Sequence, residues 1–364
     1  MKLRELERAA TALYEAGTSV HLVGPPGVGK SDIMPRVRQI LSAKYEEEFG
    51  LVCELATIRD PTDIGGFCMP AKGADGGKPI AFYTRSPLMP TAEYLAKHPR
   101  GFFFVDERNQ SDPLMQKALA PVTLWKQFGT DKLPEGWRVW SASNRVSDGA
   151  GVVKALTHLV NRERIINIEP DVGSWAVWAE EQGIHPMYIA FAKQRPGVVF
   201  TDEVPKHGKS FCTPRSFVSA SRLHSQLAGL DAAGNISMDL PSDAITSELI
   251  AGDVGEAAAA EMFAFFKLNE HLPTIEEIKA DPLKAKCPGP ERLDAAFAAA
   301  QIIVHFADAK NIDKLWKYVE RLPKELQTST AQALIPKSGS ILLNSPALTK
   351  WMSENRALIN ASGR

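Results

Sequence analysis

The sequence predicts an α/β domain built on a parallel sheet, followed by an all-helical region. Five short, continuously apolar segments alternate with helical stretches in the first 170 residues, a pattern typical of a parallel sheet with helices on both faces. A glycine-rich loop lies between the first apolar segment and the next helix. Beyond Pro170 the strand-like segments stop.

Each element can be assigned in turn. A helix over 4–15 precedes the sheet, whose strands we expect at 19–23, 51–55, 101–105, 137–142 and 165–168. The helices expected after them are 173–194, 214–228, 244–267, 290–309 and 312–322. In the helix 290–309, helical spacing predicts a core-facing stripe of Leu293, Phe297, Ala300 and Val304. Composition changes at 196–213 and at 271–290, where we expect a connector. We therefore predict an α/β domain (1–170), a helical domain (171–268) and a helical C-terminal extension (269–364).

Composition excludes several classes of protein. The chain has 364 residues, 42 Lys and Arg against 43 Asp and Glu, and 44% hydrophobic residues, values of a globular protein without a polybasic character. No apolar run is long enough to span a membrane, and the N-terminus lacks the apolar core of a signal peptide. The four scattered cysteines are expected to be reduced thiols, so we expect a cytoplasmic protein.

The glycine-rich loop fits the phosphate-binding pattern G-x-x-x-x-G-K-[ST] in its required place between a strand and a helix. Its backbone N–H groups and the helix N-terminus would face the phosphates. Lys30 would reach the β- and γ-phosphates, and the Ser31 hydroxyl would ligate Mg²⁺. The residues expected to bind nucleotide are Gly24, Pro25, Pro26, Gly27, Val28, Gly29, Lys30, Ser31 and Asp32. Pro35 would lie early in the following helix and is expected to kink it.

Two carboxylates end the third predicted strand. Asp106 and Glu107 follow a buried apolar run, where charge is costly unless it faces a cation or water. In a phosphate-loop enzyme the first acid holds the Mg²⁺ shell and the second polarises the attacking water. Asn144 ends the fourth strand and would reach the same water or the γ-phosphate. Metal other than nucleotide-bound Mg²⁺ is not expected, because neither the cysteines nor the histidines show ligand spacing.

The order of these motifs resembles the AAA+ ATPases, and more closely the MoxR family. VHLVGPPGVGKS, TIRDPTDIGG with Asp63, VDERNQSDPLMQKAL with Asn109 and Gln116, and TPRSF are each similar to segments of that family, over about residues 5–230. The resemblance implies a P-loop AAA+ core followed by a helical lid. It also implies an ATP hydrolase that uses ATP and Mg²⁺.

The resemblance assigns a role to each matching residue. Lys30 and Ser31 would be the Walker A pair, and Asp106 and Glu107 the Walker B metal ligand and base. Asn144 would be sensor 1, and Arg215 in TPRSF would be sensor 2, a lid residue reading the γ-phosphate. Arg162 would be an arginine finger inserted into a neighbouring subunit's site, which implies a homo-oligomeric ring, usually a hexamer.

This sequence departs from the family pattern at three places. Gln110 stands where the family tends to have an arginine, and Glu163 stands where a phenylalanine usually follows the finger arginine, so Arg162 and Arg164 both remain candidates. The region from about 270 to 364 matches nothing in the core family.

Two functions follow as alternatives. The first is a chaperone-like ring ATPase that remodels a protein client, for which the resemblance implies a partner with a von Willebrand factor A (VWA) domain. The segment 57–84 and a predicted hairpin over 123–137 could meet the client, with Trp125 to Phe128 facing a pore or packing locally. The second is a nucleic-acid motor or loader, which would need a basic groove; basic residues near the hairpin, such as Lys126, Lys132 and Arg138, keep this alternative open. A third reading, a nucleotide-gated scaffold, is disfavoured by Glu107.

Overall fold

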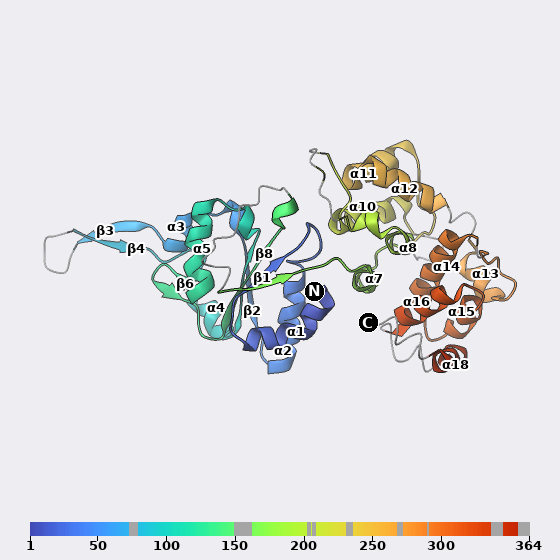
Figure 1. The fold of residues 1–364 in the computed structure, drawn as a ribbon, viewed down its shortest axis with the longest axis horizontal. Helices are drawn as coiled ribbons and strands as arrows, with labels where there is room; N and C mark the ends of the chain where they lie inside the picture. The colour runs from blue at the N-terminus through green and yellow to red at the C-terminus, as the bar shows by residue number, and fades with distance from the viewer. Residues whose placement is uncertain are drawn as a thin grey trace. The chain divides into compact units, whose positions relative to one another are not determined.

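A computed structural model of the chain describes residues 1–72, 79–148, 162–201, 205, 209–230, 236–267, 272–289, 291–335 and 345–355. The chain divides into two compact units, each described by itself below. The first comprises Met1–Asp171 with Asp202–Lys206, and the second comprises Val172–Thr201 with His207–Arg364. Figure 1 shows the course of the chain through both.

The first unit is built on the predicted parallel sheet. Its five strands lie in the order β2-β5-β8-β1-β9, and every neighbouring pair is parallel. They are β1 (Val20–Val23), β2 (Gly50–Leu55), β5 (Gly101–Asp106), β8 (Trp137–Ser143) and β9 (Arg164–Asn167). All five predicted strands are thus confirmed within about a residue. The expected fold class, a parallel sheet flanked by helices with a helical region after it, is confirmed.

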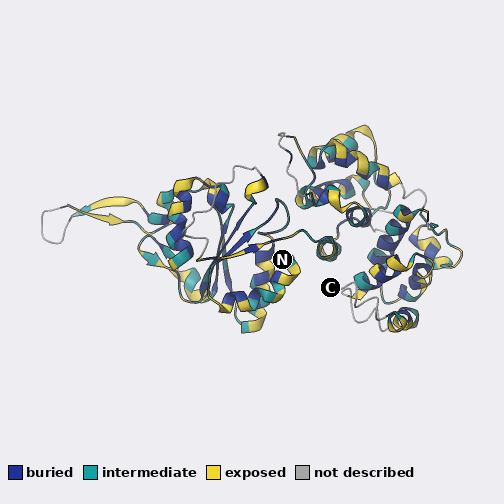
Figure 2. Ribbon diagram, in the orientation of Figure 1, coloured by how far each residue is buried: buried dark blue, intermediate teal, exposed yellow. Residues whose placement is uncertain are grey.

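Helices cover both faces of this sheet, and Figure 2 shows its strands as largely buried. One face packs Leu22, Phe104 and Trp140 against α1 (Leu3–Glu15) and α2 (Ile33–Tyr45). On the other face, the sheet residues Phe103, Val105 and Val139 pack against α5 (Pro113–Trp125). The remaining short elements are η1 (Ala56–Ile58), α3 (Pro61–Gly65), α4 (Ala92–Lys97), η2 (Arg108–Gln110) and η3 (Val146–Asp148).

The start of helix α2 decides the role of its proline. The helix starts at Ile33, so Pro35 lies in its first turn. N–H groups of the first turn have no partner within a helix, and a proline there removes no ladder hydrogen bond. The expected kink at Pro35 is therefore wrong.

Two antiparallel hairpins are added to the sheet domain. The first pairs β3 (Cys68–Lys72) with β4 (Pro79–Tyr83), and Figure 1 shows this ribbon projecting beyond α3. The second pairs β6 (Gln127–Phe128) with β7 (Asp131–Lys132) and is shorter than the predicted hairpin, because α5 continues to Trp125. Phe128 is buried with its ring 4.8 Å from that of Phe103, whereas Trp125 is exposed. The two aromatic residues therefore have different environments.

The second unit is helical apart from one isolated bridge, as far as it is described. Its helices are α7 (Val172–Glu181), α8 (Pro186–Gln194), α9 (Pro196–Val199), α10 (Pro214–Ala228), α11 (Ala244–Val254), α12 (Glu256–Phe266), α13 (Ile275–Ala280), α14 (Leu293–Phe306), α15 (Ile312–Val319), α16 (Lys324–Leu334) and α18 (Pro346–Glu354). Two predicted helices are each split in two. The break in 244–267 occurs at Gly255, whose φ of 84° suits glycine. The break in 173–194 holds Gly183, with a φ of 67°, and Pro186 starts the next helix. The predicted connector 271–290 contains α13.

Helix α14 is shared between two hydrophobic clusters. Ala298 and Ile302 pack into the cluster built on α8, α10 and α12, and Ala299 and Ile303 pack into the cluster built on α15, α16 and α18. The helix is therefore buried over most of its circumference and not along one stripe. The predicted stripe is wrong at Leu293, which opens the helix and is 51% exposed. The division of this region into a lid and an extension stays a prediction.

Buried polar side chains also join α14 to the first of these clusters. Lys193 Nζ donates a hydrogen bond to Gln301 Oε1 at 2.6 Å, and Gln301 Nε2 donates to Glu180. Burial lowers the pKa of Lys193 and the charge of Glu180 raises it. The amide of Gln301 thus links a cation on α8 to an anion on α7. Trp316 and Tyr318 are fully buried and Trp351 is nearly so, so all three aromatic side chains belong to the core.

The four cysteines are free thiols. Among the described helices none combines the length and apolar character that a membrane span requires.

His185 makes the stability of the second unit depend on pH. Its Nδ1 accepts a hydrogen bond from the Met187 amide at 3.1 Å, and its Nε2 donates to the Ser237 carbonyl at 3.1 Å. Burial lowers its pKa to about 4. The unfolded chain binds a proton near pH 6.5 while the folded chain does not. The contribution of His185 to the free energy of unfolding is therefore full above that pH and is lost as the pH falls toward 4.

We expect the wild type to lose about 2 kcal/mol of unfolding free energy through His185 between pH 7.5 and pH 5. The variant His185→Asn keeps an acceptor for the Met187 amide and does not titrate in this range. Urea unfolding followed by circular dichroism at both pH values should show a smaller pH-dependent loss in the variant. An equal loss in both proteins would contradict this account.

Candidate functional site

The glycine-rich loop lies at the carboxyl end of β1, where the strand order reverses. Strand β9 lies on one side of β1 and strands β8, β5 and β2 on the other. Open parallel sheets bind ligands at such a switch point, outside the carboxyl ends of the strands. Gly27 and Gly29 have φ of 70° and 95°, a conformation that other residues rarely adopt, and this lets the loop turn between β1 and α2.

Lys30 crosses this loop and joins it to the end of β8. Its Nζ donates hydrogen bonds to the carbonyl oxygens of Gly24 at 2.9 Å and Pro25 at 2.7 Å, and to Asn144 Oδ1 at 2.9 Å. The lysine is only 7% exposed. The ammonium group is thus held inside the loop, where a phosphate would meet it.

Ser31 and Asp106 meet across the same edge of the sheet. The Ser31 hydroxyl donates a hydrogen bond to Asp106 Oδ2, and both side chains are half-buried. Strand β8 lies between β1 and β5, so Asn144 at its end lies between the loop and the acidic pair. The structure therefore brings together four of the predicted site residues: Lys30, Ser31, Asp106 and Asn144. Asp32, also assigned to the loop, is exposed at the start of α2.

Glu107 follows in a left-handed conformation, with φ 52° and ψ 32°. This is unusual for a residue with a side chain and turns the chain sharply from β5 into η2. Its Oε2 accepts a hydrogen bond from Thr57 Oγ1 at 3.2 Å, and its backbone N–H donates to Asp106 Oδ1 at 2.9 Å. The carboxylate of Glu107 is directed toward η1 and not toward Lys30.

The turn after Glu107 is supported by buried polar groups. The Asn109 amide donates to Ser143 Oγ at 3.0 Å, and Gln116 Nε2 donates to the Ser111 carbonyl at 3.1 Å. The backbone N–H of Asn109 thus holds the acidic turn against β8, and the side chain of Gln116 holds the same turn against α5. Asp63 accepts the Asp60 amide at 3.0 Å and caps α3.

The sequence reasoning missed a buried ion pair next to this turn. Arg108 Nη1 donates to Glu163 Oε1 at 2.6 Å, and the two side chains are 4% and 1% exposed. Neighbouring His21 has its Nδ1 2.7 Å from Ser141 Oγ. Burial, and to a smaller extent the charge of Arg108, holds the pKa of His21 well below its usual range, so the imidazole is neutral. The available signal was the pair of unexpected charges in the DERNQ and NRE segments.

Arg162 and Arg164 are both exposed and flank the buried Glu163. Arg164 pairs with Val20, the first residue of β1, whereas the phosphate loop follows the last residue of that strand. The two arginines therefore lie at the opposite edge of the sheet from the loop of their own chain. Arg215 is exposed in the first turn of α10 and belongs to the second unit.

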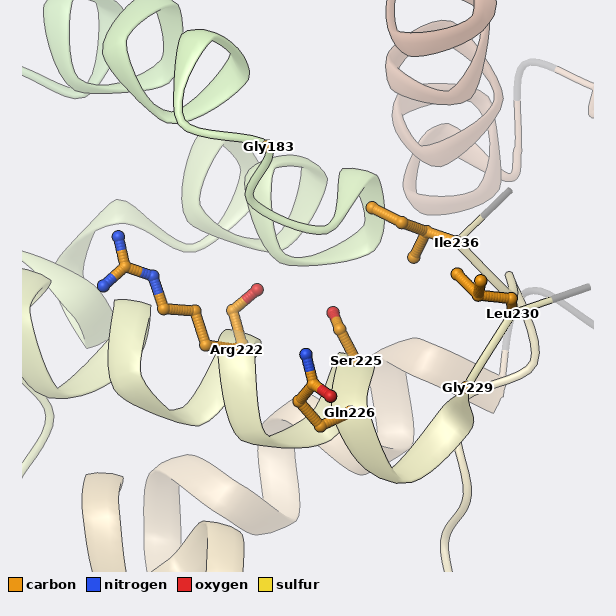
Figure 3. A pocket seen from close by; sticks show the side chains of 8 residues that line it. Gly183, Arg222, Ser225, Gln226, Gly229, Leu230 and Ile236 are labelled. Atoms are coloured by element: carbon orange, nitrogen blue, oxygen red, sulfur yellow. The ribbon is translucent and has the colours of Figure 1, made fainter. Parts of the chain in front are cut away.

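Other parts of the described chain offer less chemistry. No group of three or more His, Cys, Asp or Glu side chains capable of holding a metal exists among the described residues. A cavity of about 240 Å³ lies along α10 in the second unit, and Figure 3 shows Arg222, Ser225 and Gln226 lining it. It holds one charged side chain and no acid–base pair, so it offers no catalytic arrangement.

Comparison with known proteins adds little to this geometry. No protein-family model matches the chain, and no curated protein matches it. Solved structures that it resembles include NtrX from Brucella abortus in complex with ADP, with 15% identity, 91% of this chain and 68% of that chain covered, and a TM-score of 0.38. PCH-2 of C. elegans has 16% identity, 72% and 68% coverage and a TM-score of 0.33.

Replacing Lys30 should remove the charge that the loop offers to a phosphate. A charge-assisted hydrogen bond contributes about 1.5–3 kcal/mol, so Lys30→Met should weaken binding of a nucleoside triphosphate at least about tenfold. Equilibrium titration with a fluorescent nucleotide measures this. Lys132→Met, on exposed β7, is the control and should bind as the wild type does. Equal affinity in both variants would exclude this loop as the binding site.

Proposed function

We propose that this chain is an AAA+ ATPase that hydrolyses Mg-ATP to ADP and phosphate. The observation that carries the proposal is the convergence of Lys30, Ser31, Asp106 and Asn144 at the carboxyl edge of one sheet. The Lys30 ammonium would bind the β- and γ-phosphates, and Asn144, already its partner, would orient the γ-phosphate or the attacking water. Glu107 would act as the base after leaving Thr57.

Ser31 and Asp106 fit a magnesium ion. Their oxygens lie in direct contact, and a hydroxyl and a carboxylate are the hard donors that Mg²⁺ takes together with phosphate oxygens. Bound there, the ion would neutralise charge on the phosphates. The two side chains would exchange their mutual hydrogen bond for ligation.

We further propose that the protein works as a ring in which each site is completed by a neighbour. Arg162 and Arg164 are exposed and lie at the far edge of the sheet from their own phosphate loop. From Val20 to Gly24 the strand rises about 13 Å, so neither arginine is placed to serve its own site. An arginine supplied by the next copy would stabilise the charge on the transferred phosphoryl group. Closed symmetry then favours a ring, and the family resemblance favours a hexamer.

The client of such a motor is proposed to be a protein. The β3–β4 hairpin presents an apolar face to solvent, because Met69 pairs directly with Phe82 and the alternation of a strand adds Phe67 and Ile80 to the same face. These four side chains are 45–54% exposed. Exposed apolar side chains that cluster in this way mark protein contacts. The MoxR-like motif order adds the proposal of a VWA-domain partner and of Arg215 as the lid sensor.

Two of the three basic residues that suggested a nucleic-acid motor have structural roles instead. Lys126 Nζ donates to the Glu135 carbonyl at 3.1 Å, and Arg138 Nε donates to the Tyr14 carbonyl at 2.8 Å. Arg138 also lies over the Tyr14 ring, 4.6 Å from its centroid. Only Lys132 of the three is exposed. These contacts favour the protein remodeller over the nucleic-acid motor.

Complementation between two inactive variants tests the ATPase and the shared site together. Glu107→Gln should bind ATP without turnover, and Arg162→Ala should assemble normally but hydrolyse about 10³-fold more slowly. Co-assembled in equal amounts, the pair should recover activity, because about a quarter of the sites have both an intact acid and an intact neighbouring arginine; that share is also the recovery expected if the sites act independently. Steady-state phosphate release measures all three.

Arg164→Ala is the matched control, since the two arginines are equally candidates by exposure. The arginine that acts at the neighbouring site is the one whose alanine variant loses ATPase activity alone and regains it when mixed with Glu107→Gln. If neither arginine variant loses activity, the shared-site proposal fails while the ATPase proposal stands. If Glu107→Gln retains full turnover, the catalytic assignment itself is wrong.

The hairpin tests the nature of the client. We expect a permanently unfolded protein such as β-casein to raise the ATPase rate, and single-stranded DNA to leave it unchanged. Phe82→Ser should abolish the stimulation and preserve the basal rate, because the hairpin lies outside the nucleotide site. Stimulation by DNA, falling steeply with salt, would favour the nucleic-acid motor instead.

A further inference from the structure

The roles proposed above leave the buried Arg108–Glu163 ion pair without a function. The two side chains are almost completely shielded from water, with 2.6 Å between Nη1 and Oε1. Removing two charges from water is costly, and apolar side chains often fill the same space at no loss of stability. The resemblance noted above places a phenylalanine at the position of Glu163. A charged pair here therefore calls for an explanation beyond packing.

The pair joins two segments that the sheet holds far apart. Arg108 follows β5 and Glu163 precedes β9, and strands β8 and β1 lie between them. Three strand spacings correspond to about 14 Å. The turn η2 contacts β8 through the Asn109–Ser143 hydrogen bond. Among the described residues, His21 of β1 also lies close to the pair, and Arg108 helps to lower its pKa.

At one end the ion pair holds the acidic turn. Arg108 directly follows Glu107, whose left-handed backbone depends on the fold of η2. The Gln110 amide donates to the Glu107 carbonyl at 2.9 Å, and Ser111 Oγ donates to the Arg108 carbonyl at 2.7 Å. A shift of the Arg108 side chain is thus transmitted through a short hydrogen-bonded turn to the backbone of Glu107.

At the other end the ion pair orients the exposed arginines. Glu163 points inward to Arg108, while Arg162 and Arg164 on either side of it are exposed. On the carboxyl side the Arg164 amide donates to the Ser19 carbonyl at 2.8 Å, where β9 joins the sheet. Arg162 and Glu163 lie in the turn and bend that lead directly into β9, so Arg162 is joined through a single peptide bond to the residue that the ion pair anchors.

We propose that Arg108 and Glu163 are positioning residues that couple the acid of one nucleotide site to the arginine presented to the next protomer. The inference rests on the proposed function and identifies its regulation. When Glu107 exchanges Thr57 for the attacking water, the turn moves Arg108, and Glu163 follows with Arg162. The ion pair is a continuous physical connection whose two ends belong to different sites of the assembly.

The experiment replaces the charged pair by an apolar one. Arg108→Met/Glu163→Leu removes both charges together, so neither is left buried alone. Arg38→Met/Glu48→Leu removes a surface pair of the same unit, at 2.9 Å, and is the matched control. Each protein is co-assembled with increasing fractions of the same protein carrying Glu107→Gln. ATPase rate is plotted against that fraction, and folding and nucleotide affinity are checked separately.

Coupled sites should give a curved plot in the wild type and in the control. When active and Glu107→Gln protomers are mixed in equal amounts, the ATPase rate should differ about twofold or more from half the rate of the undiluted active protein. The apolar double variant should keep its fold and nucleotide affinity and give a straight line. Each site would then turn over independently of its neighbour's state.

Three results would overturn the inference. A double variant with the wild-type curvature would reduce the ion pair to packing, and a straight line for the wild type would show that there is no coupling to transmit. If the double variant does not fold, Arg108→Lys replaces it; that variant keeps the charge in a shorter side chain, and unchanged curvature would count against the proposal. Full activity of Glu107→Gln alone would instead refute the proposed function, so the two failures are distinguishable.

Discussion

The register of the parallel sheet is the constraint on which the site depends. Strands β1, β8 and β5 are adjacent and parallel, so their carboxyl ends meet at one edge. That edge gathers a loop, an amide and two acids from positions up to 120 residues apart in sequence. Lys30 then closes the arrangement with hydrogen bonds to two loop carbonyls and to Asn144. Without the central position of β8, the amide would not reach the loop.

The same sheet places the phosphate loop at one edge and the arginines proposed to act on a neighbouring copy at the other. The loop lies at the carboxyl end of β1, and Arg162 lies beyond its amino end. Parallel strands make these two edges different, because every strand begins at one edge and ends at the other. Neither Arg162 nor Arg164 is therefore placed to serve the phosphates of its own chain, which is why we propose that a neighbouring copy supplies the arginine. The buried Arg108–Glu163 pair connects the two edges within one protomer.

The helical unit depends on one helix that is shared between its two hydrophobic clusters. Helix α14 supplies side chains to two clusters at once, so neither cluster is complete without it. Gln301 on that helix bridges Lys193 and Glu180, two groups that would be costly to bury unpaired. Arg215 is the one residue of this unit for which we propose a role at the nucleotide site.

The sequence alone determined the strands, the phosphate loop and the acidic pair, because each is a local pattern of apolar, glycine or charged residues. It could not determine that 244–267 breaks at Gly255 or that Leu293 is exposed, since both depend on what the helices pack against. Nor could it pair Arg108 with Glu163, which lie 55 residues apart and meet only because η2 folds back under the sheet. A local motif depends on adjacent residues and can be predicted from them, whereas a contact across four strands exists only once the sheet has formed.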